Sequence, residues 1–306
     1  YAPPEPTQRL PMTLEEVDPV IRARVEKKVG SLPTLPTLTT NLVAMLQDPE
    51  TEPKEIAKVA ATDPAVATEI IRAINSAYFA LREPCNDLDR AILLLGYNWV
   101  KFLVIRMSMT KSGKQDDAYE ARLSALWHRS FMTSECVTTL IRNFTRLDAA
   151  DAATAALLHD LGHLVQMEVP GAQGGVDTQV MFETAGIPVD ERVYVEQDLF
   201  GINHCLVGGM VAEHLGLTNL VRAVQLYHHH PVNAIWNLPL EGNVVQIIAM
   251  VKLADHMVHA FHQRQNPQPQ IMTGMLHAEP DIASFRPFFP NLPDYPILMG
   301  FLETEL

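Results

Sequence analysis

Apolar residues recur along most of this chain at intervals of three and four, the spacing that places side chains on one face of an α-helix. No segment keeps the strict alternation of a half-buried strand, and no G-x-G-x-x-G is present, so an α/β nucleotide-binding fold has no support. A buried strand is the alternative for residues 101–107 alone. We therefore predict an all-α protein, with helices over residues 13–29, 52–62, 65–80, 88–109, 116–144, 148–168, 179–186, 189–217, 219–227 and 242–265.

Proline and glycine mark the predicted breaks. Two prolines precede a further helix that ends near Asp48, Gly96 divides residues 88–109 into two helices, and Gly201 separates two more. Residues 1–11 are Pro-rich, as is typical of a linker, and the chain lacks an initiator Met, so we expect an upstream domain. Residues 170–178 are predicted to form a Gly-rich loop. The tail is expected to pack through an aromatic cluster: Phe285, Phe288, Phe289, Tyr295 and Phe301.

The composition narrows the class of protein. An apolar fraction of 47% and a charged fraction of 19% are those of a soluble globular protein, and no run approaches the roughly 18 apolar residues of a membrane span. A formal charge of -13 opposes non-specific binding to nucleic acid. Cys85, Cys136 and Cys205 form no C-x-x-C pair, which argues against a disulfide framework or a zinc knuckle. Without a signal peptide, we expect a cytoplasmic protein with no nucleic-acid or membrane partner.

The richest chemistry lies in residues 152–168, an otherwise apolar segment that holds His159, Asp160 and His163. A lone histidine on an apolar helix is most often a hydrogen-bonded core residue. The adjacent aspartate changes this interpretation, because a His-Asp pair with further histidines and a later aspartate is the ligand set of a metal that activates water against a phosphate ester. Those later residues are His204, His228, His229, His230 and Asp255.

The following stretches occur in this order along the chain: LPTLPTLTTNLVAML, TDPAVATEIIRAINSAYFA (which contains INSA), LDRAILLLGYNWVKFLV, LLHDLGHLV, EQDLFGINHCLVGGMVAEHLGL, HHHP and the LAD around Asp255. Together they resemble the HDOD family, the HD-related output domain of bacterial signalling proteins. The resemblance implies residues 30–262 as the HDOD domain, with an N-terminal helical lobe (30–115) joined to a core like that of HD phosphohydrolases (116–262). Residues 1–29 would be a linker and N-terminal helix, and 263–306 a C-terminal packing segment.

The resemblance also implies a metal-ligand set. By position the ligands are His159 and Asp160, then His204, then His228 or His229, and finally Asp255. Such a pocket would take a divalent Fe, Mn, Mg, Ni or Zn ion. No catalytic residue is assigned from the sequence.

The first ligand of the HD set is where this chain departs from the family. Relatives often read LWxHS, whereas this chain has Arg129 at the ligand position and His128 one residue earlier. One residue turns a helical side chain by about 100 degrees, so His128 cannot simply substitute. We hypothesise that the Arg129 guanidinium stands in for a metal and pairs with Asp160 and Asp255.

The remaining pocket histidines are open to two interpretations. His163 could contact phosphate, or it could lie on the helix surface or behind the ligands. His256, His259 and His262 are interpreted as a solvated helix face.

The resemblance favours a signal-transduction module with a degenerate HD pocket that binds a partner protein or a small nucleotide. A metal-dependent phosphohydrolase acting on a phosphomonoester or nucleotide is the alternative. A plain interaction scaffold is a third.

Overall fold

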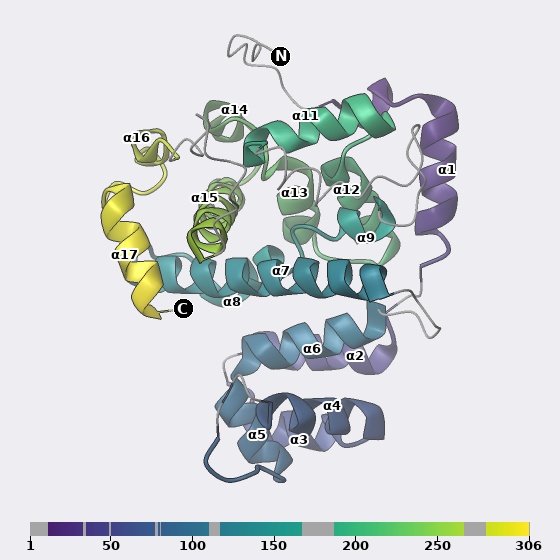
Figure 1. The fold of residues 1–306 in the computed structure, drawn as a ribbon, viewed down its shortest axis with the longest axis vertical. Helices are drawn as coiled ribbons and strands as arrows, with labels where there is room; N and C mark the ends of the chain where they lie inside the picture. The colour runs from purple at the N-terminus through teal and green to yellow at the C-terminus, as the bar shows by residue number, and fades with distance from the viewer. Residues whose placement is uncertain are drawn as a thin grey trace. The chain divides into compact units, whose positions relative to one another are not determined.

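In the computed structural model, the described residues are 12–32, 35–48, 50–76, 79, 81–109, 117–166, 187–265 and 280–305, and they are helical with no strand among them. The helices, labelled in Figure 1, are α1 (Pro19–Val29), α2 (Thr37–Gln47), α3 (Pro53–Ala60), α4 (Pro64–Ile74), α5 (Leu88–Leu95), α6 (Tyr97–Met109), α7 (Asp117–Phe144), α8 (Ala149–Leu157), α9 (Gly162–Gln166), α11 (Val189–Phe200), α12 (His204–His214), α13 (Asn219–Tyr227), α14 (Val232–Trp236), α15 (Gly242–Gln265), α16 (Ile282–Phe285) and α17 (Tyr295–Glu305). The predicted all-α class is confirmed. The expected linker over 1–11, loop over 170–178 and helix over 179–186 lie outside the described residues.

The chain divides into two compact units, Leu32–Gln115 and Tyr1–Ser31 with Asp116–Leu306. In the first unit α2 packs on α6, and α3 and α4 pack on α5. The side chain of Asn75 ends α4 and also bonds both the N–H and the carbonyl of Cys85, at 2.7 Å each. This asparagine belongs to the INSA stretch, so the structure gives that motif a role in holding a loop to a helix end.

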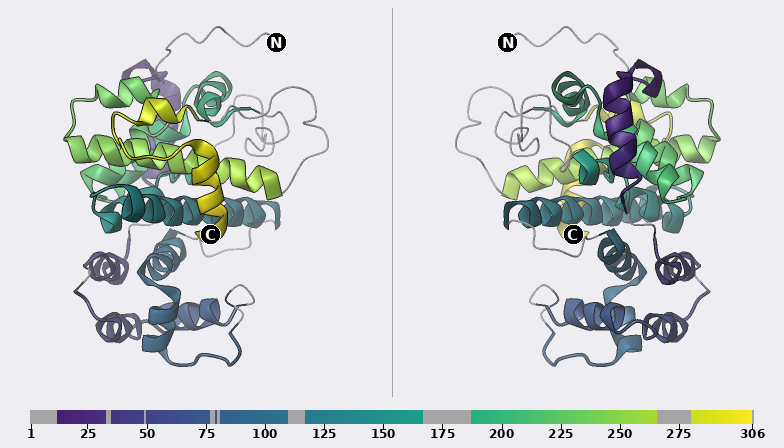
Figure 2. Two further views of the ribbon diagram at one scale, coloured as in Figure 1. Left: turned by 90° about the vertical axis from the view of Figure 1, so that its left-hand side faces the viewer. Right: turned by 90° about the vertical axis from the view of Figure 1, so that its right-hand side faces the viewer.

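The second unit is built around α7, which packs on α8 and α15. Helices α12 and α13 pack on each other, α9 packs on α12, and α1 on both α9 and α12. The C-terminal α17, yellow in Figure 2, packs on α15, and its Phe301 meets Phe144 at the end of α7 edge to face, with ring centroids 5.8 Å apart. Four other residues of the predicted aromatic cluster are buried: Phe285, Phe288, Phe289 and Tyr295.

Helix α15 is apolar and long enough over Gly242–His262 to cross a membrane by length and composition alone. However, 67% of its most apolar window is buried inside the protein. It also carries buried Lys252 and Asp255. We therefore treat α15 as the core helix of its unit.

Two predicted helices are broken in the structure. The helix expected over 13–29 is a short 3-10 turn, Leu14–Glu16, followed by α1, because Asp18 caps α1 through bonds to Val20 N and Ile21 N. The helix expected over 148–168 stops at Leu157 and resumes at Gly162. The helix expected over 65–80 ends early, at Ile74.

Gly162 lets α9 approach α12 closely enough for the two backbones to touch. A Cβ atom at this position would lie 1.9 Å from the carbonyl oxygen of His204 and 2.8 Å from the backbone nitrogen of Gly208. Both obstacles are backbone atoms, which cannot rotate away. The break between α8 and α9 is therefore positioned by a glycine that no other residue could replace without moving α12.

Gly162→Ala is expected to lower the free energy of unfolding by about 2–3 kcal/mol or more, because the added methyl group overpacks a backbone contact. Urea unfolding followed by circular dichroism measures the loss. Gly300→Ala is the matched control: nothing lies within 4 Å of its added Cβ, so it should raise stability by about 0.5–1 kcal/mol. Equal stabilities for the two variants would contradict the proposed close approach.

Candidate metal centre

The His-Asp pair lies in the turn between α8 and α9, residues 158–161, rather than inside a helix. The backbone there closes hydrogen bonds to the third residue back, from His159 N to Ala156 O at 3.4 Å and from His163 N to Asp160 O at 3.1 Å. Gln225 of α13 holds the turn from outside by donating its side-chain amide to the carbonyl of Leu158. This local unwinding lets the side chains of two adjacent residues reach one pocket.

Three histidines around Asp160 each have their Nδ1 atom committed to an acceptor. His159 Nδ1 lies 2.7 Å from the carbonyl oxygen of Ala156, and His228 Nδ1 lies 2.9 Å from that of Val224. His204 Nδ1 lies 2.8 Å from a carboxylate oxygen of Glu196. Carbonyl and ionised carboxylate oxygens only accept, so each Nδ1 carries the hydrogen. In the neutral imidazole, each Nε2 therefore presents a lone pair.

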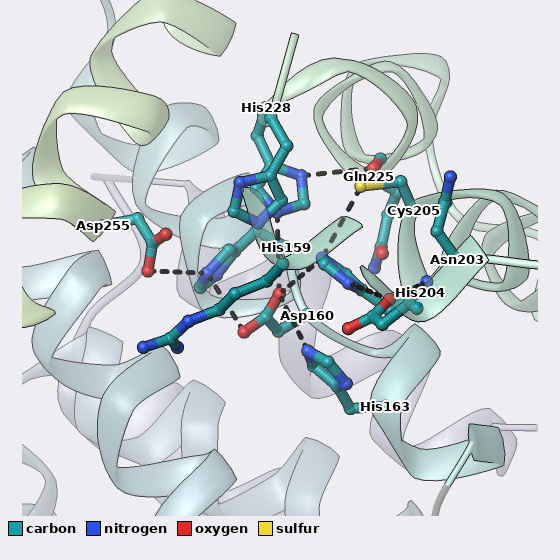
Figure 3. A network of polar contacts seen from close by, with 12 residues as sticks. His159, Asp160, His163, Asn203, His204, Cys205, Gln225, His228 and Asp255 are labelled. Atoms are coloured by element: carbon teal, nitrogen blue, oxygen red, sulfur yellow. Dashed lines mark hydrogen bonds and ion pairs between the residues drawn. The ribbon is translucent and has the colours of Figure 1, made fainter. Parts of the chain in front are cut away.

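The Nε2 atoms converge on the carboxylate of Asp160, as Figure 3 shows. Those of His204 and His228 lie 3.5 and 3.6 Å from its Oδ1 atom. That of His159 lies 3.5 Å from its Oδ2 atom and also 3.5 Å from Oδ1 of Asp255. Asp160 thus divides the pocket into an Oδ1 side, with two imidazoles and the Nε2 atom of His163 slightly further away at 3.9 Å, and an Oδ2 side with one imidazole and a second carboxylate.

Both aspartates of the pocket are ionised. Burial by itself would raise the pKa of Asp160, but His159 and His163 hold it well below its usual range. Burial would likewise raise the pKa of Asp255, and His259 and His159 hold it low. Conversely, burial lowers the pKa of His228 and, strongly, that of His229. Burial would also lower the pKa of His159 and His204, but Asp160 raises that of His159, and Cys205 and Glu196 raise that of His204 well above its usual value. These two rings therefore favour the protonated form in the absence of a cation, and a cation that binds their Nε2 atoms would displace those protons.

This donor set fits a divalent cation. Asp160 Oδ1, His159 Nε2 and His228 Nε2 are buried and have no hydrogen-bond partner among the described residues. Two ligand atoms about 2.0–2.1 Å from one ion at tetrahedral angles lie about 3.4 Å apart. The measured 3.5 and 3.6 Å on the Oδ1 side are within a few tenths of that value. One nitrogen of His229 also lies within 4.8 Å of the ligand atoms of Asp160, His204 and His228.

Glu196 of α11 is a site residue that the sequence analysis missed. It is fully buried, and its Oε2 atom accepts from the backbone N–H of His204 at 2.7 Å as well as from the His204 ring. A carboxylate behind a ligating imidazole fixes the ring and makes it a better ligand. The available signal was a glutamate on the inward face of a helix that also buries Val189 and Val193.

His163 lies behind the ligands rather than on the helix surface. Its ring stacks on that of His204, with centroids 4.2 Å apart, and its Nδ1 atom lies 3.0 Å from the side-chain oxygen of Gln166. Burial and the neighbouring His204 lower its pKa to about 4. His163 is therefore neutral near pH 7 and supplies no positive charge to the pocket.

His259 corrects our interpretation of the last histidines as a solvated face. Its Nδ1 atom lies 3.1 Å from Oδ1 of Asp255, and its Nε2 atom lies 2.8 Å from NH1 of Arg192. Because a guanidinium only donates, His259 Nε2 accepts and Nδ1 donates to the aspartate. His256 bonds Asp190 at 3.0 Å, and only His262 is exposed. Helical spacing could not reveal that α11 covers this face.

The side chains of Arg129 and His128 leave α7 in directions about 100 degrees apart. Arg129 is buried, 6% exposed, whereas His128 is exposed and is not part of the buried cluster. The structure therefore corrects the inclusion of His128 among the pocket residues, as the helical turn between neighbours requires. Burial chiefly lowers the pKa of His163 and of His259, and the charge of Arg129 adds to both effects, so its guanidinium faces the pocket.

A helical core that gathers a His-Asp pair, later histidines and a final aspartate around one buried pocket defines an HD-like domain. The model of the HDOD domain matches residues 32–231, and the chain belongs to the HDOD family.

Solved structures share this fold. An HDOD domain protein of unknown function from Geobacter sulfurreducens has a TM-score of 0.61 at 20% identity, covering 94% of this chain and 95% of that one. A protein from Marinobacter aquaeolei VT8, whose name proposes a role in signal transduction, has a TM-score of 0.63 at 16% identity, covering 94% and 62%. A protein from Shewanella amazonensis SB2B, whose name proposes phosphohydrolase activity, has a TM-score of 0.58 at 18% identity, covering 92% and 94%.

A relative by sequence is an uncharacterized protein of Treponema pallidum (strain Nichols), 20% identical over 257 residues. These residues are 84% of this chain and 47% of that protein, so the chain spans about half the length of this relative.

The metal-free protein is expected to lose stability as the pH falls from 6.5 toward 4. Burial lowers the pKa of five histidines in the folded state, to about 4 for His163 and His230, whereas they protonate near pH 6.5 when unfolded: His163, His228, His229, His230 and His259. The unfolded chain then binds more protons, which lowers the free energy of unfolding. His159 and His204, whose pKa values are raised, are protonated in both states in this range and add no slope.

Urea unfolding at several pH values in a chelator measures this slope. His163→Gln should reduce it by up to about 1.4 kcal/mol per pH unit, one proton's share. His214→Gln, at the end of α12, is the control and should leave the slope unchanged. A stability that is constant or rises on acidification would show that these histidines are not held neutral.

Proposed function

We propose that this chain is a regulatory module of bacterial signal transduction whose HD pocket binds one divalent cation, and which acts by binding a partner protein or a small nucleotide. One observation carries the cation: the Nε2 atoms of His204 and His228 face the ionised Oδ1 of Asp160 at 3.5 and 3.6 Å, and the Nδ1 atom of each ring is already bonded. A buried carboxylate in this setting needs a positive charge beside it, which a cation supplies in place of the protons on the rings. The residues that would hold it are Asp160, His204 and His228, with His229 beside them.

Charge balance favours one cation over two. With its histidines neutral, as they are when they bind a cation, the pocket contains three buried carboxylates, of Asp160, Glu196 and Asp255, and two buried guanidinium groups, of Arg129 and Arg192, which leaves a net charge of -1. One dication brings this to +1, whereas two would bring it to +3. Uncompensated buried charge is costly, so the second addition is opposed. Asp190 and Lys252 form an ion pair of their own and do not change the balance.

Arg129 takes the place of a second metal in this proposal. The Oδ2 side of the pocket has His159 and Asp255 as its remaining ligands, and the family's first histidine is replaced there by a buried arginine. A guanidinium can compensate two carboxylates without coordinating water. We propose that the pocket is degenerate in this sense, and that its cation serves structure and signalling.

The second candidate function is a metal-dependent phosphohydrolase. It is favoured by the presence of His159, Asp160, His204 and Asp255 in one buried cluster. A bound divalent cation would supply a Lewis acid and lower the pKa of a water molecule. The chain's own contribution would be to orient His204 through Glu196 and to keep the pocket closed to bulk solvent. The buried arginine on the Oδ2 side weighs against it.

The remaining parts of the proposal come from composition and family. We propose a cytoplasmic protein with neither nucleic acid nor membrane as a partner. A net charge of -13 supports the absence of non-specific nucleic-acid binding.

Isothermal titration of the chelator-treated protein with Mn²⁺ or Zn²⁺ is expected to show one bound ion per chain. Asp160→Asn should weaken binding at least 100-fold, because it removes the ligand shared by both sides of the pocket. His128→Ala, on the exposed side of α7, is the matched control and should bind like the unmodified protein.

Arg129→His should raise the stoichiometry to two, since it restores a ligand and removes a positive charge. Arg129→Ala should instead destabilise the fold by leaving two carboxylates uncompensated. Two ions in the unmodified protein, or none at millimolar concentration, would contradict the proposal.

Hydrolysis of p-nitrophenyl phosphate and bis-p-nitrophenyl phosphate with Mn²⁺, Mg²⁺, Ni²⁺ or Fe²⁺ is expected to stay at the level of Asp160→Ala. The reason is the incomplete ligand set on the Oδ2 side. Turnover that Asp160→Ala abolishes would establish the phosphohydrolase instead.

A further inference from the structure

The carboxylate of Asp190, in the first turn of α11, lies where nitrogen atoms from two other elements meet. Lys252 Nζ is in direct contact with its Oδ1 atom, and His256 Nε2 lies 3.0 Å from the same atom. His229 Nδ1 lies 4.0 Å from it, beyond hydrogen-bond distance. Three nitrogen atoms therefore converge on a single oxygen.

The three side chains around this oxygen are built into the interior, whereas the carboxylate reaches them from the surface. The side chains of Lys252, His229 and His256 are 4%, 5% and 14% exposed, and that of Asp190 is 46% exposed. The Nδ1 atom of His229 is buried and has no hydrogen-bond partner in the part of the chain that the structure describes. The three nitrogen-bearing side chains are therefore fixed parts of the interior, and the carboxylate of Asp190 leaves the Nδ1 atom of His229 without a hydrogen bond.

We infer that Lys252, His256 and His229 form an oxyanion site for a phosphate group, and that Asp190 occupies this site when no ligand is bound. One carboxylate oxygen cannot give three nitrogen atoms a well-directed bond each, whereas a tetrahedral phosphate presents several oxygens to them. A charged amine and two imidazoles form the set that recognises such a group. The inference deepens the proposed function, since it assigns the phosphate of a small nucleotide to a defined place.

His229 connects this oxyanion site to the cation pocket. One of its nitrogens lies within 4.8 Å of ligand atoms of Asp160, His204 and His228, and its Nδ1 atom faces Asp190. A phosphate at Lys252 therefore lies one imidazole ring away from the cation. A ligand that enters there must displace Asp190.

Displacement of Asp190 releases the first turn of α11 from α15. The same helix contacts the cation pocket through Glu196, which bonds His204, and through Arg192, which bonds His259. Phosphate binding is thus coupled to the helix that orients a cation ligand. This gives the module one element that responds to both ligands.

The experiment is titration of the chelator-treated protein with inorganic phosphate at constant ionic strength. Asp190→Ala removes the internal competitor and should bind phosphate at least tenfold more tightly than the unmodified protein. Asp190→Asn removes the charge with little change of shape and should gain in the same direction, even if the alanine variant folds poorly. Asp198→Ala, an exposed carboxylate on the same helix, is the matched control and should gain nothing.

Adding Lys252→Met to Asp190→Asn should abolish the gain, and His256→Gln should reduce it. Acetate at the same concentrations should bind at least tenfold more weakly than phosphate to Asp190→Asn. These titrations are made in the absence of any bound cation, whereas the cation proposal is tested by its own titration with Mn²⁺ or Zn²⁺, so a failure of the cation proposal is distinguishable from a failure of this one.

The inference is overturned if neither Asp190 variant binds phosphate more tightly than the unmodified protein and Asp198→Ala. It is also overturned if the gain survives Lys252→Met. Acetate binding as tight as that of phosphate would overturn the assignment to a phosphate group.

Discussion

The second unit depends on one buried carboxylate, that of Asp160, which faces the Nε2 atoms of three histidines. The Nδ1 atom of each ring is bonded to a carbonyl or carboxylate oxygen, so the Nε2 atoms of His159, His204 and His228 are the ones left to bind a proton or a cation. A pocket of this kind is unfavourable by itself and becomes favourable around a cation. Two features of the surrounding structure form this pocket. The break between α8 and α9 exposes the His-Asp pair, and Gly162 lets α12 approach closely enough to place His204 beside it.

Helix α11 is joined to this pocket by charge rather than by apolar packing alone. Its Asp190, Arg192 and Glu196 each bond a histidine on another helix: His256, His259 and His204. Buried hydrogen bonds and ion pairs cost desolvation free energy and add little net stability, but their strength depends strongly on the charge of the groups that form them. A helix held this way is sensitive to what the pocket binds.

Membership of the HDOD family accounts for the fold, and the solved relatives support the fold alone at 16–20% identity. Two buried side chains bear on what the pocket can bind. Arg129 of α7 is buried, and His163, whose pKa is lowered to about 4, stacks on His204.

The sequence by itself determined the helical class, the order of the helices and the residues that gather in the buried pocket, because apolar spacing, Pro and Gly breaks and the His-Asp pair are local signals. It placed the breaks at Gly96 and Gly201 correctly. It did not show that α8 ends before His159, since Leu158 and Leu161 continue the apolar spacing of a helix through the turn, and the cause is the contact of Gly162 with α12. Glu196, Arg192, Asp190 and the buried setting of His259 were decided by tertiary structure alone. These residues acquire their roles from the packing of α11 over α12 and α15, and a long-range contact leaves no periodicity in a single sequence.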